Sequence, residues 1–286
     1  MIPLEELTQI AIQAVLKAGK IIHNNTHKNI NIEKKVGGNT YASQIVTKVD
    51  KACEEVILKH LTPTCTSYDL GLLTEETEDN KSRFDKAFFW CVDPLDGTLA
   101  FINKRPGFSV AIALVAKDGT PKIGVVYDPI SATVYHAIHT KGAFKNGRPW
   151  VTTSQNNYLT YVTDKKLADT PNQNKIKDIL HKKVMELGVQ DYQEISGAGA
   201  VLNAILVAEN APAIFVKLPK KEKGGGSLWD FAATACICKE LGVQATTFKG
   251  NKLDLNNKHT TFMNDKGIYY YSIKRIDKVT NSFVNL

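Results

Sequence analysis

One short stretch, from Trp90 to Thr98, constrains this chain more than any other. It reads WCVDPLDGT, so an apolar run ends abruptly in two carboxylates, a proline, a glycine and a hydroxyl. The run from Ala87 to Val92 predicts a buried strand that Pro94 stops, and the residues from Gly97 to Phe101 predict a short helix. Carboxylates and the free N–H groups of a helix start are therefore expected together at one strand end.

This combination indicates phosphoryl chemistry. Carboxylate oxygens are the ligands that a hard cation such as Mg²⁺ prefers. The free N–H groups at the start of a helix suit a phosphate group. An Asp-Pro turn with a capping residue explains the same pattern structurally, and the stretch alone does not decide between the two interpretations.

Composition places the chain among ordinary soluble proteins. Its 286 residues suffice for one large domain or two of common size, and 43% hydrophobic with 23% charged residues excludes the disordered and fibrous classes. No apolar run approaches the ~20 residues that span a bilayer. The N-terminus also lacks the basic start and apolar core of a signal peptide. We expect a cytoplasmic protein with no membrane partner.

The cysteines and the net charge exclude other classes. The five cysteines are an odd set without metal-finger spacing, which predicts reduced thiols packed in cores. The formal charge of +7 is spread over many lysines, which predicts a solvated surface that can also attract anionic substrates. The chain has no RNP-like motif, zinc finger or basic heptad region, and this disfavours a nucleic-acid partner.

The first quarter of the chain predicts two helices. Apolar residues recur at helical spacing from Leu4 to Asn24, and a second amphipathic helix is expected from Lys48 to Leu61, ended by Pro63. Between them, the polar segment from Asn29 to Ser43 predicts a mobile hairpin or loop.

Acidic residues flank these elements. Asp50 stands three residues after Thr47, which fits a helix capping box and is the favoured structural interpretation of Asp50 taken alone. A short strand predicted from Tyr68 to Thr74 delivers Glu75 and Glu76 at its end.

The remainder predicts an antiparallel meander followed by an α/β unit. The meander consists of strands at Phe108 to Ala116, Ile123 to Tyr127 and Thr133 to Ile138. The α/β unit consists of a helix at Lys175 to Leu187, a strand at Gln190 to Ile195 and a helix at Ala198 to Ala208. A change of pattern at Trp150 predicts two domains, 1–150 and 151–286.

A last strand and helix complete the predicted order. The strand spans Ala213 to Val216 and leads into a basic, glycine-containing loop from Lys217 to Gly226. The helix spans Phe231 to Leu241, where Asp230 could serve as its N-cap.

The order and spacing of these motifs resemble the inositol monophosphatase superfamily. Its early Val-Thr-x-x-Asp element resembles Ile45 to Asp50, and its two Glu residues after a strand resemble Glu75 and Glu76. The D-P-x-D-G-T string at Asp93 to Thr98 and the distant Trp229-Asp230 pair are the most specific matches. Further similarity covers Gly124 to Pro129 and Gly142 to Gly147, so the resemblance spans nearly the whole chain.

The resemblance implies a fold and an activity. The fold would be a layered αβαβα sandwich of mixed α+β and α/β character, commonly a homodimer. The activity would be hydrolysis of phosphate monoesters with two or three Mg²⁺ ions, typically inhibited by lithium. A haloacid-dehalogenase-type phosphatase, which uses an aspartyl-phosphate, is the nearest competing family, but its D-x-D-x-T spacing differs from the string found here.

The resemblance also implies roles for individual residues. The metal ligands would be Glu75, Asp93, Asp96 and Asp230, together with the backbone carbonyl of Leu95. Asp50 and Thr98 would orient and deprotonate the attacking water, with Glu76 in a supporting catalytic role. The N–H groups of Gly97 and Thr98 would hold the phosphate. These oxygen ligands suit cations that polarise phosphoryl oxygens and neutralise the leaving group.

One position departs from the inositol monophosphatase pattern and bears on the substrate. Where those enzymes usually carry an acid that binds sugar hydroxyls, this chain has Lys217. A cation there suits a second anionic group, which favours a 3'(2'),5'-bisphosphate nucleotide over inositol-1-phosphate. A catalytically inactive metal-binding, anion-binding or RNA-associated protein with this fold is the alternative of another class.

Overall fold

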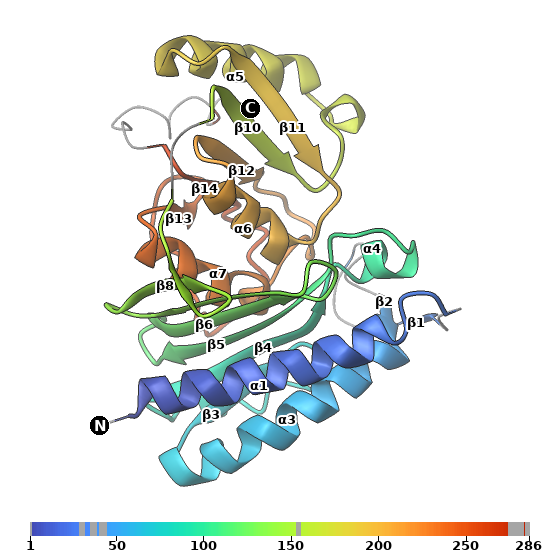
Figure 1. Ribbon diagram of the computed structural model, residues 1–286, viewed down its shortest axis with the longest axis vertical. Coiled ribbons are helices and arrows are strands. Elements are labelled where there is room, and N and C mark those ends of the chain that lie inside the picture. The colour runs from blue at the N-terminus through green and yellow to red at the C-terminus, as the bar shows by residue number, and fades with distance from the viewer. Residues whose placement is uncertain are drawn as a thin grey trace.

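The computed structural model describes residues 2–28, 32–34, 39, 45–152, 156–273 and 283. The larger sheet in this part of the chain has seven strands in sequential order (Figure 1). They are β3 (Gly71–Thr74), β4 (Phe88–Asp96), β5 (Ser109–Ala116), β6 (Pro121–Asp128), β7 (Thr133–Ile138), β8 (Gly142–Lys145) and β9 (Arg148–Trp150). Only β3 and β4 pair in parallel; from β4 to β9 the sheet is the expected antiparallel meander.

A second sheet comes from the later part of the chain. Its five strands lie in the order β11-β10-β12-β14-β13. They are β10 (Tyr158–Thr163), β11 (Asp191–Ser196), β12 (Ala213–Lys217), β13 (Gln244–Thr247) and β14 (Ile268–Tyr271). Strand β10 pairs in parallel with β11 and β12, whereas β14 pairs antiparallel with β12 and β13. The sequence analysis did not predict β10, β13 or β14.

Helices alternate with the two sheets to give five layers. The helices in the described residues are α1 (Leu4–His23), α3 (Lys48–Tyr68), α4 (Thr98–Ile102), α5 (Gln173–Leu187), α6 (Ala200–Glu209) and α7 (Leu228–Glu240). Helices α1 and α3 cover one face of the larger sheet, α6 and α7 lie between the sheets, and α5 covers the outer face of the smaller sheet (Figure 1). This is the predicted αβαβα sandwich. Short 3-10 helices span Ser82–Phe84 and Leu167–Asp169.

The core between the sheets unites residues from both predicted domains. Ala111 and Val126 of the larger sheet share one buried cluster with Phe215 and Tyr270 of the smaller sheet. Strand β5 is buried at seven of its eight positions because helices cover both faces of its sheet, which explains its nearly continuous apolar sequence. The division into 1–150 and 151–286 stays a prediction.

The prediction that Pro63 ends the second helix is wrong, because α3 continues to Tyr68. Pro63 is exposed, so the backbone hydrogen bond that it cannot donate is lost on the solvent side, where water can replace it. On the opposite side Thr64 is buried and accepts a 2.8 Å hydrogen bond from Trp90 Nε1. The helix ends instead at Asp69, whose φ of 53° is left-handed.

Of the polar segment predicted from Asn29 to Ser43, the structure describes only residues 32–34 and 39. Strands β1 (Ile32–Lys34) and β2 (Ile45–Thr47) pair antiparallel, as a hairpin requires. The predicted mobile tip lies outside the described residues.

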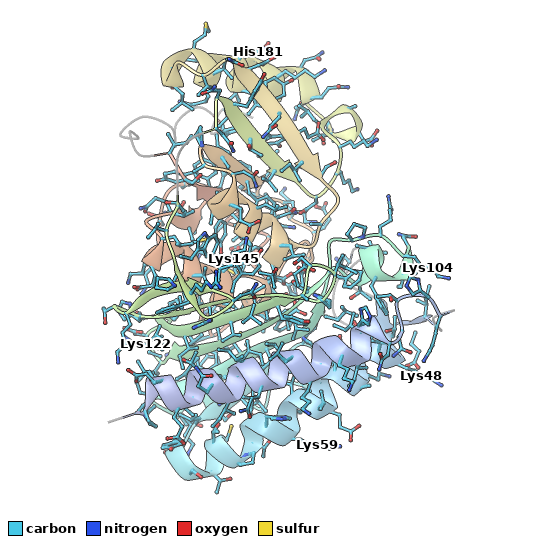
Figure 2. All side chains as sticks on the ribbon, viewed as in Figure 1. Lys48, Lys59, Lys104, Lys122, Lys145 and His181 are labelled. Carbon is cyan, nitrogen blue, oxygen red and sulfur yellow. The ribbon has the colours of Figure 1, made fainter. Side chains whose placement is uncertain are left out.

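The surface agrees with the predicted spread of positive charge. Figure 2 labels lysines on several elements of the molecule: Lys48, Lys59, Lys104, Lys122 and Lys145. All five cysteines are unpaired, and burial raises the pKa of Cys53, Cys91, Cys236 and Cys238. No helix in the described ranges combines the length and apolarity needed to cross a lipid bilayer.

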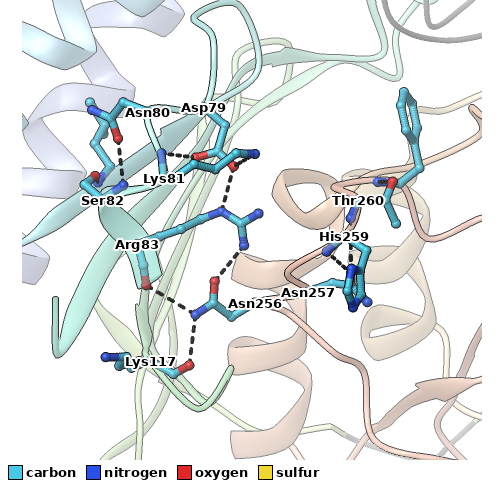
Figure 3. Close-up of polar contacts among 12 residues, drawn as sticks. Asp79, Asn80, Lys81, Ser82, Arg83, Lys117, Asn256, Asn257, His259 and Thr260 are labelled. Carbon is cyan, nitrogen blue, oxygen red and sulfur yellow. Dashed lines mark hydrogen bonds and ion pairs between the residues drawn. The ribbon is translucent and has the colours of Figure 1, made fainter. Parts of the chain in front are cut away.

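A buried arginine ties the connection between β3 and β4 to the segment between β13 and β14 (Figure 3). Arg83 is 1% exposed, and its Nε lies 2.9 Å from Asp79 Oδ2. Its Nη1 donates to Asn256 Oδ1 at 2.7 Å, and Asn256 Nδ2 donates back to the Arg83 carbonyl. Residues 173 positions apart in the sequence thus share one polar network.

Candidate active site

Strand β4 continues past Pro94, so the prediction that Pro94 stops the strand is wrong. Asp93 pairs with Ala111 and Asp96 with Ser109, which leaves one extra residue on β4. This is a β-bulge, a position where proline is tolerated because no ladder hydrogen bond is required of it. In a regular strand, residues three apart point to opposite faces. The bulge removes that alternation and lets both carboxylates face the same site.

Three carboxylates from two elements meet at this bulge. Asp93 and Asp96 of β4 and Asp230 of α7 each offer an oxygen within 4.8 Å of the other two. Asp93 is 1% exposed and Asp96 is 6% exposed. The site therefore brings together residues that are more than 130 positions apart in the sequence.

The carboxylate of Asp96 is held by the start of α6. The backbone N–H groups of Ala200 and Val201 donate to its two oxygens at 3.1 and 3.0 Å. Gly199 precedes them, and a Cβ atom there would lie 2.2 Å from Asp96 Oδ2. A glycine is therefore required for this close approach.

Asp230 is held by the start of its own helix. Helix α7 begins at Leu228, so the predicted start at Phe231 and the N-cap role of Asp230 are wrong. Ser227 is the N-cap, and its N–H donates to Asp230 Oδ2 at 2.6 Å in a capping box. Asp230 thus caps the helix from its third position and faces the other carboxylates at the same time.

The electrostatics of this cluster favour a cation. Burial and the neighbouring charges of Glu75, Asp96 and Asp230 raise the pKa of Asp93 well above its usual range. Burial and Asp230 raise the pKa of Asp96 despite the Val201 N–H, and burial and Glu75 raise the pKa of Asp230 to about 6. Crowded, desolvated carboxylates repel one another unless protons or metal ions neutralise them. An all-oxygen donor set of this kind fits a hard divalent cation.

A pair formed by the Asp50 carboxylate and the Thr98 hydroxyl lies beside the cluster. Thr98 Oγ1 lies 3.1 Å from both Asp50 Oδ1 and the Leu95 carbonyl. Burial raises the pKa of Asp50 to about 6, opposed by the hydrogen bonds from Thr47 and reinforced by the charge of Glu75. The predicted capping box is confirmed, because Thr47 N donates to Asp50 Oδ2 at 2.9 Å and Asp50 N donates to the Thr47 hydroxyl. Asp50 therefore caps helix α3 and also contacts Thr98 at the site.

Lys217 also faces these acids, but it has a carboxylate partner. Its Nζ lies 2.5 Å from Asp164 Oδ2, and Asp164 Oδ1 accepts a 3.0 Å hydrogen bond from Asn203. Burial alone would lower the pKa of Lys217, but Asp164, with Asp230 and Asp96, raises it above the usual value. The charge predicted to await a second anion is thus paired with Asp164.

Gly97 follows Asp96 directly and so borders the carboxylate cluster. Gly97 adopts a φ of 81° between the bulge and α4, where a Cβ atom would lie 2.5 Å from the Gly107 carbonyl. Glu76 lies farther out and is one of the charges that raise the pKa of the exposed Lys51, after Glu33.

The sequence model that describes the inositol monophosphatase family matches residues 3–280 of this chain. The chain belongs to the inositol monophosphatase family. As a member, it is a metal-dependent phosphatase, and the acidic cluster provides a candidate site for divalent ions.

Individual family members resemble it over most of their length. It is 32% identical to inositol monophosphatase 2 of Solanum lycopersicum over 91% of this chain and 94% of that protein. It is 26% identical to the inositol-1-monophosphatase of Bacillus subtilis over 92% and 94% of the two chains. It is also 28% identical to the Nus factor SuhB of Pasteurella multocida over 88% and 89%.

Solved structures of the family share the fold. The inositol monophosphatase of Anabaena superposes with a TM-score of 0.71 at 23% identity, covering 100% of this chain and 98% of that one. A staphylococcal inositol monophosphatase solved with products gives a TM-score of 0.74 at 18% identity over 98% and 96% of the two chains.

Sequence reasoning missed three residues that support the site: Asp164 contacts Lys217, Asn203 contacts Asp164, and Glu54 contacts Glu76. Asp164 follows β10, a strand whose run of β-branched and aromatic residues could have indicated it. Asn203 lies on α6 and is fully buried, which its sequence context does not reveal. Glu54 lies four residues after Asp50 on α3, a spacing that places both on one helix face.

Proposed function

We propose that this chain hydrolyses small phosphate monoesters with two or three Mg²⁺ ions held by Asp93, Asp96, Asp230, Glu75 and the Leu95 carbonyl. The supporting observation is the buried cluster of three carboxylates at the β4 bulge. Mg²⁺ takes carboxylate and carbonyl oxygens. When bound, such ions supply positive charge to the phosphoryl oxygens and lower the pKa of a water molecule.

The residues of the chain supply the proton acceptor. The Thr98 hydroxyl can take a hydrogen bond from the attacking water while it donates to Asp50 Oδ1. In the metal-free protein burial raises the pKa of Asp50 to about 6, which suits a group that accepts a proton near neutral pH and releases it again. The Thr47 N–H keeps the other Asp50 oxygen in place. The N–H groups of Gly97 and Thr98 would hold the phosphate beside this pair.

The preferred substrate is a 3'(2'),5'-bisphosphate nucleotide, with AMP and phosphate as products. Lys217 supports this choice because its ammonium group lies among the acids of the site and is the cation available for a second phosphate. Lys165 and Lys220 add positive charge nearby, since burial, followed by the charges of Lys217 and Lys165, lowers the pKa of Lys220. Asp164 opposes this choice until a substrate anion displaces it from Lys217.

Inositol-1-phosphate is the second candidate. The Lys217–Asp164 pair favours it, because a paired lysine offers less charge to a second anion and Asp164 can accept hydrogen bonds from sugar hydroxyls. The names of the relatives in Solanum lycopersicum and Bacillus subtilis support it as well.

A panel of phosphate esters with and without Mg²⁺ tests the proposal. We expect phosphate release only with Mg²⁺, and a higher kcat/KM for 3'-phosphoadenosine 5'-phosphate than for inositol-1-phosphate. The reverse preference would reject the bisphosphate nucleotide. Release from no ester would favour the inactive binding protein.

Two substitutions separate the candidates further. Lys217→Met should raise KM for the bisphosphate nucleotide by at least ~10-fold, because an anion loses a charge-assisted partner. Asp164→Asn should lower the same KM, since it frees Lys217. If neither substitution alters KM for the bisphosphate nucleotide relative to inositol-1-phosphate, Lys217 does not select the substrate.

A further inference from the structure

A buried carboxylate outside every recognised motif lies behind the Glu75 loop. Glu54 is on α3 and only 6% exposed. Its Oε2 accepts hydrogen bonds from the Thr74 hydroxyl and, at 2.9 Å, from the Glu76 backbone N–H. Its Oε1 accepts a hydrogen bond from the Thr77 hydroxyl. A buried carboxylate is expensive unless donors compensate it, and here three donors come from one short segment.

The three donors bracket Glu75. Thr74 is the last residue of β3, and Glu76 and Thr77 follow Glu75 directly. The parallel pairing of β3 with β4 ends where Thr74 pairs with Val92, so residues 75–77 lie beyond the end of this ladder. One carboxylate therefore binds the residues on both sides of Glu75, whose own charge acts on Asp93, Asp230 and Asp50.

Helix α3 thereby holds two parts of the site with two acids one turn apart. Asp50 contacts Thr98, next to the β4 bulge, and Glu54 contacts the loop that carries Glu75. Residues four apart lie on the same face of a helix. The helix sets the spacing between the two loops, because both acids are buried and neither can move without losing several hydrogen bonds.

We propose that Glu54 is a positioning residue that fixes Glu75 for metal binding by hydrogen-bonding its two neighbours. The proposal rests on the proposed role of Glu75 as a metal ligand. Partners that orient metal ligands typically contribute 10 to 100-fold to metal affinity. Glu54 would act through the geometry of the loop and not through contact with the metal.

A calorimetric titration of the metal-free protein with Mn²⁺ alone tests the role of Glu54. It measures metal affinity and does not depend on catalytic activity. Glu54→Ala should weaken Mn²⁺ binding by ~10 to 100-fold. Glu54→Gln should stay within about 3-fold of wild type, because its amide oxygen can accept from Thr74 and Glu76 while its NH₂ group donates to the Thr77 hydroxyl. With Mg²⁺ raised to saturation, Glu54→Ala should recover most of its kcat.

Thr64→Val provides the matched control. Thr64 is buried on the same helix and accepts the Trp90 N–H, far from the Glu75 loop. Its substitution should lower the free energy of unfolding by ~1 to 3 kcal/mol through an unsatisfied donor and leave Mn²⁺ binding unchanged. If Glu54→Ala does not fold, Thr77→Val takes its place, because Thr77 is exposed and its change removes a single donor.

The outcomes separate this proposal from the proposed function. Wild-type Mn²⁺ affinity in Glu54→Ala, or in Thr77→Val if that variant replaces it, would overturn the positioning role. Equal losses in Glu54→Gln and Glu54→Ala would also overturn it, since charge and not geometry would then matter. Unchanged Mn²⁺ affinity in Glu75→Gln would remove Glu75 from the metal site and the proposal with it, whatever ester the enzyme hydrolyses.

Discussion

Single residues at this site serve the fold and the chemistry together. Asp50 closes the capping box of α3 and accepts a hydrogen bond from Thr98, and Asp230 closes that of α7 and faces the carboxylates of Asp93 and Asp96. A capping interpretation of either residue is therefore compatible with a catalytic role. The sequence alone could not reveal this, because a capping box depends on neighbours in the chain whereas the second contact comes from a distant element.

Gly199→Ala tests how closely the backbone at the start of α6 packs against the Asp96 carboxylate. Its φ of −65° accepts alanine, but the new Cβ would lie 2.2 Å from Asp96 Oδ2 and displace that carboxylate. We expect Mn²⁺ affinity and kcat/KM to fall by ~10-fold or more. Gly188→Ala is the control, because its Cβ would contact nothing and only its left-handed φ would cost stability, ~1 kcal/mol. Equal metal affinity in the two variants would contradict the close contact at Asp96.

At the level of elements, local signals located most helices and strands but misplaced their ends. Proline was the main cause, since Pro63 lies within α3 on its exposed side and Pro94 lies in the bulge of β4. At Pro63 water can replace the lost backbone hydrogen bond, and at Pro94 the bulge requires none. The bulge was not predictable from the sequence, because it is defined by the pairing with β5.

Helix α7 and strand β6 pack closely enough to test their contact. A Cβ at Gly124 would lie 2.2 Å from the Ala233 carbonyl of α7, the helix that carries Asp230. Gly124→Ala should lower the free energy of unfolding by ~1 to 3 kcal/mol and also weaken Mn²⁺ binding, since α7 must shift. Gly142→Ala, where a Cβ meets nothing, should leave Mn²⁺ binding unchanged. Urea unfolding and Mn²⁺ calorimetry measure the two effects, and tight binding by Gly124→Ala would contradict the coupling.

At the scale of the whole molecule, the layers bring buried acids from both halves of the chain to one point. The family motifs predicted this assembly, because their order along the chain resembles that of known relatives and the same five layers appear. The sequence could not show which partner each charged side chain contacts. Lys217 was predicted to bind a second anionic group of the substrate, and the fold places Asp164 against it.

Concentrated buried acids make the stability of the metal-free protein depend on pH. The pKa of Asp50 is raised from 3.8 to about 6, so the folded state binds more protons than the unfolded state between these values. Its stabilising contribution is complete below 3.8 and is lost as the pH rises through about 6, amounting to ~3 kcal/mol. In EDTA, wild type should therefore lose about this much stability relative to Asp50→Asn between pH 4 and pH 7.5. A pH-independent difference in urea unfolding would contradict the raised pKa.

The central claim is that the carboxylates at the β4 bulge bind the metal ions that hydrolysis requires. Asp93→Asn tests it most directly, because Asp93 is 1% exposed and lies between Glu75, Asp96 and Asp230. Measured with saturating Mg²⁺ on the best ester of the panel, phosphate release should fall by at least ~10³-fold. The variant should unfold in urea at the same or a higher concentration than metal-free wild type, since one repelling charge is gone. A folded Asp93→Asn protein that releases phosphate at the wild-type rate would contradict the account.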